Sequence, residues 1–247
     1  MTLRYTTIEI DHPKKQLCVG LCSFWSDQHS AVVRDKYARW FSENELNTFE
    51  STIEKVQKNF FIGRIAIKYL INQKKEVHPE RVKIIKGLFG QASLEDSSYP
   101  IGLSHCHNQA VAAVISSDIP VGIDLEKIVK YEQGLRAMKS QMNELDMRLL
   151  NSMKQQSKEN FLTMFWSAKE SLSKFFLGGL SINFKNFTIS DIKQMSPYCY
   201  LLSFVGIHHI NILGVLLPDE KVFTISLPSY AAPKWPIFES KIIKVIQ

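Results

Sequence analysis

The sequence lacks the features that would place it in a membrane, a secreted or a zinc-binding class. No apolar run approaches the roughly 18 residues that a membrane-spanning helix needs, and the first fifteen residues have no apolar signal-peptide core. The four cysteines, Cys18, Cys22, Cys106 and Cys199, follow no zinc-ligand spacing. We therefore expect a cytoplasmic protein with free thiols and no membrane contact, as a reducing compartment favours.

Runs of basic residues are also absent. The chain of 247 residues carries 30 lysine and arginine residues against 24 aspartate and glutamate residues, a net charge of +6. This excess favours an anionic partner, which could be a phosphorylated cofactor or an acidic protein. Because no five basic residues are consecutive and aromatic residues do not alternate with basic ones, we expect no nucleic-acid partner.

The chain does contain clear helix and strand patterns. Apolar residues at steps of three or four predict helices over 44–70, 143–153 and 160–176, the first begun by a Ser42–Glu45 capping box. The segment 87–102 is rich in Gly, Ser and Pro and is expected to be a loop, 116–118 is expected to be a turn, and the last twenty residues have no clear pattern. Short apolar runs predict strands over 16–25, 82–85, 110–115, 121–125, 200–205, 208–217 and 222–227.

Three short motifs recur about a hundred residues further along the chain, always in the same order. At the same spacing Lys68 corresponds to Lys169. This recurrence predicts an α+β fold of two similar halves, residues 1–117 and 118–247, related by a pseudo-twofold axis with the active site in the cleft between them. The motif pairs are Val19-Gly20-Leu21 with Val121-Gly122-Ile123, Asn44-Glu45-Leu46 with Asn143-Glu144-Leu145, and Asn59-Phe60 with Asn160-Phe161.

Three acidic residues break the repeat, because their counterparts in the first half are a cysteine and two aromatic residues. Asp124 and Glu126 are two apart on an expected strand, so both side chains leave the same face. Adjacent carboxylates repel unless a cation or proton lies between them, and their oxygens suit Mg²⁺. If the following helix packs on this sheet, Glu170 supplies a third oxygen ligand, and Lys169 and Lys174 lie beside it for a diphosphate. A solvated Glu170–Lys174 pair is the simpler alternative.

A second polar cluster precedes the strand at 110–115. The Ser104 hydroxyl, the His105 imidazole and free backbone N–H groups between loop and strand could hold a phosphate. A turn serine with a partly buried histidine is the alternative interpretation. We expect no zinc here, because no second ligand pair lies at a usual spacing.

Together these motifs resemble the 4′-phosphopantetheinyl transferases of the large surfactin and enterobactin-synthetase type. The resemblance implies a pseudo-symmetric monomer that binds coenzyme A between its halves, uses Mg²⁺, and transfers phosphopantetheine to a serine of an apo acyl or peptidyl carrier protein, releasing 3′,5′-ADP. The matching motifs are Ser104-His105-Cys106, Val121 to Lys127 (VGIDLEK), Trp166 to Ser171 (WSAKES) with Lys174, and Gly63-Arg64-Ile65-Ala66.

The resemblance also implies a role for each matching residue. Asp124, Glu126 and Glu170 become the metal ligands, and Glu170, Lys174 and Asp124 the catalytic residues. The implied coenzyme A contacts are Lys169 and Lys174 to the pyrophosphate, Ser104 and His105 to phosphate, and Arg64 to the nucleotide.

One loop departs from the family pattern. The family's G-x-K-G-x-P loop corresponds to Gly87 to Ala92, where Phe89 replaces the lysine and Ala92 the proline. Lys83 or Lys86 could compensate for the missing lysine. The alternatives to the transferase are a metal-dependent phosphodiester hydrolase and a carrier-protein or nucleotide-binding module without activity. Siderophore, polyketide, nonribosomal peptide and fatty-acid pathways are all compatible with the resemblance.

Overall fold

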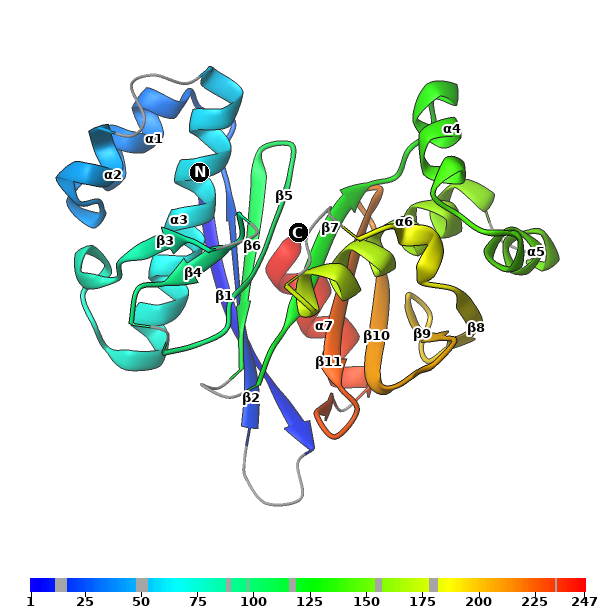
Figure 1. Cartoon of the computed structure of the whole chain (residues 1–247). Helices are drawn as coiled ribbons and strands as arrows, with labels where there is room; N and C mark the ends of the chain where they lie inside the picture. The colour runs from blue at the N-terminus through cyan, green and yellow to red at the C-terminus, as the bar shows by residue number, and fades with distance from the viewer. Residues whose placement is uncertain are drawn as a thin grey trace.

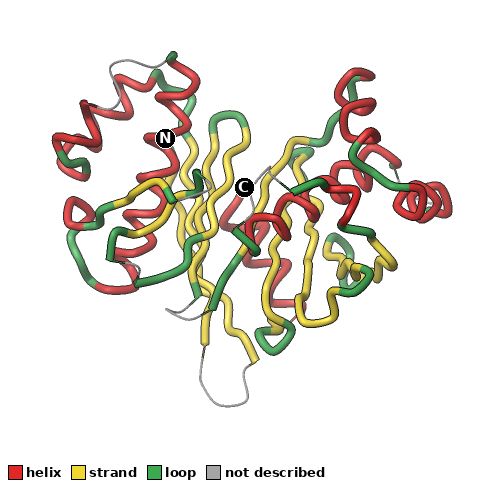
Figure 2. The backbone as a smooth tube through the Cα atoms, viewed as in Figure 1, coloured by secondary structure: helices red, strands yellow, loops and turns green. Residues whose placement is uncertain are grey.

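The computed structural model describes residues 1–11, 17–47, 53–87, 90–96, 98–115, 119–153, 157–177, 182–233 and 235–247. The described chain has an α+β fold, with helices flanking two five-stranded sheets and one two-stranded sheet (Figures 1 and 2). None of the helices in these ranges is both long enough and apolar enough to cross a membrane.

The first part of the chain begins with two strands, continues with a group of helices and ends with a group of strands. Two short 3-10 helices, Ala38–Trp40 and Pro79–Arg81, connect the longer elements. The elements are β1 (Thr2–Asp11), β2 (Leu17–Trp25), α1 (Ser30–Tyr37), α2 (Glu43–Asn47), α3 (Glu54–Lys75), β3 (Ile84–Lys86), β4 (Ala92–Leu94), β5 (Gly102–Cys106) and β6 (Gln109–Val114).

The second part begins with one strand, continues with a group of helices and then a group of strands, and ends with a helix. A 3-10 turn at Phe184–Asn186 separates the two groups. The elements are β7 (Gly122–Lys127), α4 (Glu132–Ser140), α5 (Glu144–Ser152), α6 (Lys158–Phe175), β8 (Ile189–Gln194), β9 (Cys199–Phe204), β10 (Ile207–Leu217), β11 (Lys221–Pro228), β12 (Ala232–Pro233) and α7 (Trp235–Ile246).

The two large sheets are antiparallel throughout. The N-terminal sheet has the order β12-β1-β2-β6-β5 and the C-terminal sheet has the order β7-β11-β10-β9-β8. The end of the chain returns to the first sheet, where Pro233 of β12 pairs with Ile10 of β1. This return means that residues on both sides of 118 build the N-terminal sheet, and the predicted division at 117/118 stays a prediction.

One hydrophobic core combines side chains of both large sheets with those of α7. It includes Val19 and Val111 from the N-terminal sheet, Ile123 and Phe223 from the C-terminal sheet, and Phe238 from α7. A second core lies under α3, which packs on β2 and β6, and a third lies under α6, which packs on β7 and β11. Each large sheet is thus covered by one long helix on one face and shares the common core on the other.

Most predicted elements are confirmed to within about two residues. The expected helix over 44–70 is instead two helices, α2 and α3, with 48–52, including Phe49, outside the described residues. The expected loop over 87–102 contains β4, in which Ser93 pairs with Ile85 of β3. Phe89 and the turn at 116–118 also lie outside the described residues.

The last twenty residues contain a helix, α7, which the sequence pattern did not predict. Phe238, Ile242 and Val245 of α7 are buried at helical spacing. The prolines that hid the pattern precede the helix or lie in its first turn, where a missing backbone N–H breaks no intrahelical hydrogen bond. The strands β1, β5 and β8 and the helices α1 and α4 were also absent from the prediction.

Capping boxes begin α2 and α5. The Ser42 amide donates to Glu45 Oε2 at 3.0 Å, and the Glu45 amide donates to Ser42 Oγ at 3.3 Å, as predicted. Asn143 and Asp146 exchange the same two hydrogen bonds at 2.9 and 3.0 Å, 101 residues further on (42 to 143). The recurrence supports the predicted internal repeat, and the pseudo-twofold axis stays a prediction.

Candidate active site

The candidate site lies where β7 and α6 approach each other most closely. A Cβ atom added to Gly122 of β7 would lie only 1.9 Å from the Ser171 carbonyl oxygen of α6, so only glycine permits this approach. The Ser171 hydroxyl lies 2.9 Å from Ser226 Oγ on β11, which holds the helix against the same sheet. The close contact brings Asp124 of β7 beside Glu170 and Lys174 of α6, as the sequence predicted.

Three carboxylates converge at this contact. Oxygens of Asp124, Glu126 and Glu170 all lie within 4.8 Å of one another. Asp124 is 1% exposed, and its Oδ2 atom is buried without a hydrogen-bond partner in the described part of the chain. Burial, together with the charge of Asp124, raises the pKa of Glu126 to about 7 and that of Glu170 to about 8. Crowded carboxylates with a spare buried oxygen fit a divalent cation that prefers oxygen ligands, such as Mg²⁺.

Lys174 is the cation closest to the acids. Its Nζ donates to Asp124 Oδ1 at 2.7 Å and to Ser104 Oγ at 3.2 Å, and lies 3.6 Å from Glu170 Oε2. Burial lowers the lysine pKa, but the charges of Asp124 and Glu170 outweigh it, and the net shift is upward. Lys174 therefore stays protonated and partly neutralises the acids.

Ser104 belongs to β5 and joins the acid cluster. Its hydroxyl donates to Asp124 Oδ1 at 2.9 Å and accepts the Leu125 N–H at 3.1 Å. The expectation that Ser104 and His105 lie between loop and strand is wrong, because β5 pairs with β6 across both residues. Ser104 thus orients Asp124.

His105 fills a space that Gly63 of α3 leaves open. A Cβ atom at Gly63 would lie 2.3 Å from His105 Nε2. That nitrogen is buried and has no hydrogen-bond partner in the described residues. Burial, reinforced by the charge of Lys174, lowers the pKa of His105 to about 4. At neutral pH the imidazole is uncharged, so it can offer a ligand a hydrogen bond but not a positive charge.

The site opens into two adjoining cavities. We call them the acidic lobe, of about 410 Å³, and the basic lobe, of about 320 Å³. Both are lined by His105, Leu103 and Gly90 to Ala92, so they lie next to each other, and we refer to the two together as the cleft. The acidic lobe is otherwise lined mainly by Ser104, Asp124, Glu126, Glu170, Lys174 and Leu177, and the basic lobe by Asn59, Phe60, Arg64, Ile67, Ile85 and Lys86.

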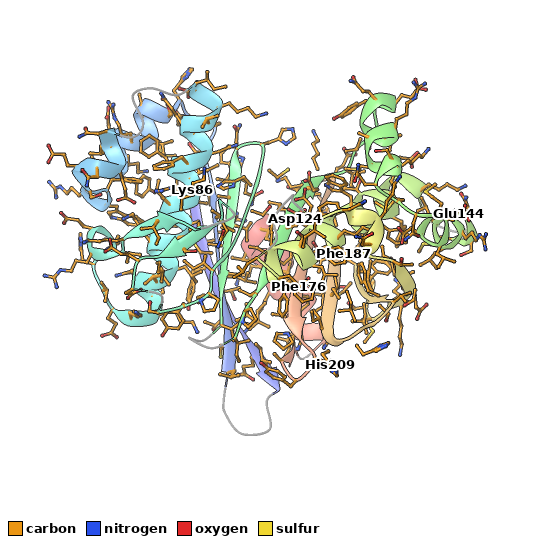
Figure 3. All side chains as sticks on the ribbon, viewed as in Figure 1. Lys86, Asp124, Glu144, Phe176, Phe187 and His209 are labelled. Atoms are coloured by element: carbon orange, nitrogen blue, oxygen red, sulfur yellow. The ribbon has the colours of Figure 1, made fainter. Side chains whose placement is uncertain are left out.

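The basic lobe carries two cations, Arg64 and Lys86. The Arg64 guanidinium carbon lies 3.4 Å from the centre of the Phe60 ring. Of the two lysines considered as substitutes for the one missing at position 89, Lys86 lines the lobe, whereas Lys83 forms an ion pair with Glu95 at 3.2 Å and lines another cavity. Lys86 lies in the left part of the fold and Asp124 near its centre (Figure 3).

Lys169 does not reach the cleft. It is fully buried and forms an ion pair with Asp146 of α5, and its Nζ donates to the Gln141 carbonyl at 3.4 Å. Adjacent helix positions point about 100° apart, so Glu170 faces the acids while Lys169 faces α5. The expected pyrophosphate contact through Lys169 is therefore corrected. A signal existed in the sequence, since Glu45 and Asp146 are separated by the same 101 residues as Lys68 and Lys169.

The cleft thus combines what a phosphoryl-transfer enzyme requires, oxygen ligands for a cation and positive side chains for phosphates. Residues 120–225 match the model of the 4′-phosphopantetheinyl transferase superfamily, which supports membership of the chain in this superfamily. Its members transfer phosphopantetheine to carrier proteins, and use coenzyme A and a divalent metal. The matched segment contains the three acids and Lys174, whereas Arg64, Ser104 and His105 precede it. No curated protein matches the chain.

Proposed function

We propose that this protein transfers 4′-phosphopantetheine from coenzyme A to a serine of an apo acyl or peptidyl carrier protein, releasing 3′,5′-ADP. The observation that carries the proposal is the acidic lobe, in which Asp124, Glu126 and Glu170 meet Lys174 beside a second lobe lined by cations. The family match over the same acids supports it.

The charge distribution of the cleft suggests how coenzyme A lies in it. The diphosphate belongs in the acidic lobe, where Lys174 and a cation held by the acids would offset its charge. The nucleotide end belongs in the basic lobe, where Arg64 and Lys86 supply positive charge and His105 supplies a neutral hydrogen-bonding group. The pantetheine arm and the incoming serine then approach past Leu177, a half-exposed residue on the wall of the acidic lobe.

The metal would be held by Asp124, Glu126 and Glu170, whose oxygens fit Mg²⁺. When bound, it would supply Lewis-acid stabilisation of the diphosphate charge. Asp124 is held in place by Ser104 and Lys174. That fixed arrangement lets the site stabilise charge without reorganising during the reaction.

The side chains account for the proton and the leaving group. The serine oxygen bonds to the phosphorus of phosphopantetheine, and the bond from that phosphorus to the bridging oxygen breaks, so that 3′,5′-ADP leaves. Lys174, protonated at neutral pH, donates to the oxygen on which charge develops. Glu170 accepts the serine proton in its ionised form, which a cation held by the acids would favour at neutral pH by offsetting their charge.

Incubation with coenzyme A, Mg²⁺ and a panel of apo carrier proteins tests the proposal. A carrier mass gain equal to phosphopantetheine is expected, strongest for carriers with an acidic surface because the chain carries a net charge of +6. Adenylate products without modified carrier would indicate the hydrolase, and binding without turnover the inactive module. A single species at the monomer mass in size-exclusion chromatography with light scattering would support the proposed monomer.

A further inference from the structure

A buried carboxylate in the first half of the chain links its scaffold to the cleft. Glu45 lies at the start of α2, and its Oε2 accepts from the Ser42 amide at 3.0 Å and lies 3.1 Å from Lys68 Nζ. Lys68 is fully buried and donates to the Val82 carbonyl at 2.6 Å. This oxygen therefore serves the fold.

The other oxygen of Glu45 faces the cleft's arginine. Glu45 Oε1 lies 3.3 Å from Arg64 Nε, and both atoms are buried with no hydrogen-bond partner elsewhere in the described ranges. Phe60 covers one face of the same guanidinium. The Arg64 side chain is thus fixed by a carboxylate at one edge and an aromatic ring at one face, while it lines the basic lobe.

In the second half the acid at the matching position, Asp146, has no link to the cleft. Asp146 pairs with the buried Lys169, and its second oxygen accepts the Ile189 N–H at 2.8 Å. At the spacing of 101, Arg64 corresponds to Phe165, a core residue. Both oxygens of Asp146 are therefore used within the fold, whereas one oxygen of Glu45 is left to Arg64.

We propose that Glu45 is a positioning residue that holds the Arg64 guanidinium against the basic lobe and so increases the affinity for the phosphorylated nucleotide end of coenzyme A. A guanidinium fixed before binding loses less conformational freedom when it contacts phosphate. The inference rests on the proposed function, since it takes coenzyme A as the ligand.

Binding of coenzyme A by titration calorimetry, with Mg²⁺ and no carrier, tests the proposal. Glu45→Gln keeps an oxygen for the Ser42 amide but removes the charge. Because that change also strips Lys68 of its counter-charge, each variant is made in a Lys68→Met parent as well as in the wild type. In both backgrounds Glu45→Gln should raise the Kd for coenzyme A about tenfold, which is a loss of about 1.4 kcal/mol of binding free energy.

A double-mutant cycle separates positioning from general destabilisation. If Glu45 acts through Arg64, Glu45→Gln should leave the Kd unchanged once Arg64→Gln is present. In the transfer assay, the KM for coenzyme A should rise while kcat changes less than about twofold, a split that loss of folded protein would not produce. An unchanged Kd in the Lys68→Met parent, or the same loss with and without Arg64, would overturn the inference alone. Wild-type protein that binds no coenzyme A would overturn the proposed function with it.

Discussion

The two long helices of the molecule are held by the same kind of buried ion pair. Lys68 of α3 pairs with Glu45, and Lys169 of α6 pairs with Asp146. Both lysines are fully buried, and both acids belong to the capping box of a preceding short helix. The shared arrangement indicates that these lysines tie each long helix to the short helix that precedes it.

The next residue along each helix is where the two regions differ. Glu170 follows Lys169 and joins the acid cluster, whereas Tyr69 follows Lys68 and stacks against Trp40 with ring centres 6.2 Å apart. The same scaffold thus presents a carboxylate to the cleft on one side and an aromatic ring to a hydrophobic cluster on the other. The chemical difference between the two halves therefore comes from the residues that follow the two buried lysines, and not from the lysines themselves.

The largest expected effect comes from substituting the residue that follows the buried lysine in each half. Glu170→Gln should lower the rate of phosphopantetheine transfer by about 10²–10⁴, because it removes both a metal ligand and the proton acceptor. Tyr69→Phe, the matched change in the other half, should leave the rate within about twofold. Transfer is followed by carrier mass, and circular dichroism checks the fold. Wild-type activity in Glu170→Gln would remove Glu170 from the mechanism.

The two buried lysines should differ in their effect on stability. Lys169→Met leaves Asp146 as a buried charge without a cation and should lower the free energy of unfolding by about 3–5 kcal/mol. Lys68→Met leaves Glu45 with Arg64 3.3 Å away, so a loss of about 1–3 kcal/mol is expected, from the carbonyls that lose their donor. Urea unfolding measures both. Equal losses would show that Arg64 does not compensate Glu45.

The meeting of the acids could be predicted because it follows from local periodicity. Asp124 and Glu126 share a strand face, and Glu170 lies on the helix that packs against that strand. The direction of Lys169 could not be predicted this way, because it depends on where α5 packs. Only the common spacing of 101 between Lys68 and Lys169, and between their acids, carried that information.

The basic lobe was less accessible to sequence reasoning. Lys86 lines it because β3 and β4 form a two-stranded sheet, and strands of three residues are too short to give a recognisable alternation. Arg64 was assigned through family resemblance, whereas its partner Glu45 was recognised as half of a capping box and as part of a repeated motif, with no link to Arg64. The link between the two residues is the contact of Glu45 on α2 with Arg64 on α3, which only the structure shows.

Two glycines offer a smaller and more graded comparison. Gly122→Ala puts a Cβ atom against backbone atoms of α6, and should cost about 1–3 kcal/mol while shifting Glu170 away from Asp124. Gly63→Ala meets only the His105 ring, which can turn, and gains helix propensity of about 1 kcal/mol. We expect near wild-type stability but weaker coenzyme A binding in Gly63→Ala. Urea unfolding and calorimetry distinguish the two, and equal destabilisation would contradict the comparison.

The last comparison concerns the pH dependence of the metal-free protein. Burial beside Asp124 raises the pKa of Glu126 to about 7 and of Glu170 to about 8, from 4.5. Above pH 4.5 the unfolded chain ionises these groups while the folded chain keeps them protonated. The unfolded state then binds fewer protons, so stability should fall as pH rises from about 4.5 to about 8 and level off above that range.

Thermal unfolding in a chelator, repeated with Mg²⁺, measures this dependence. At pH 8 the ion should raise the Tm by several degrees, because it binds the ionised acids of the folded state. It should raise the Tm less at pH 5.5, where protons compete for the same oxygens. Glu170→Gln should remove the part of the profile that comes from Glu170, since an amide does not ionise, and leave the part that comes from Glu126. A Tm gain from Mg²⁺ that is equal at both pH values would place the ion away from these acids, because protons would then not compete with it. The described residues of the first half have apolar side chains at the matching positions and offer no comparable cluster of titrating groups.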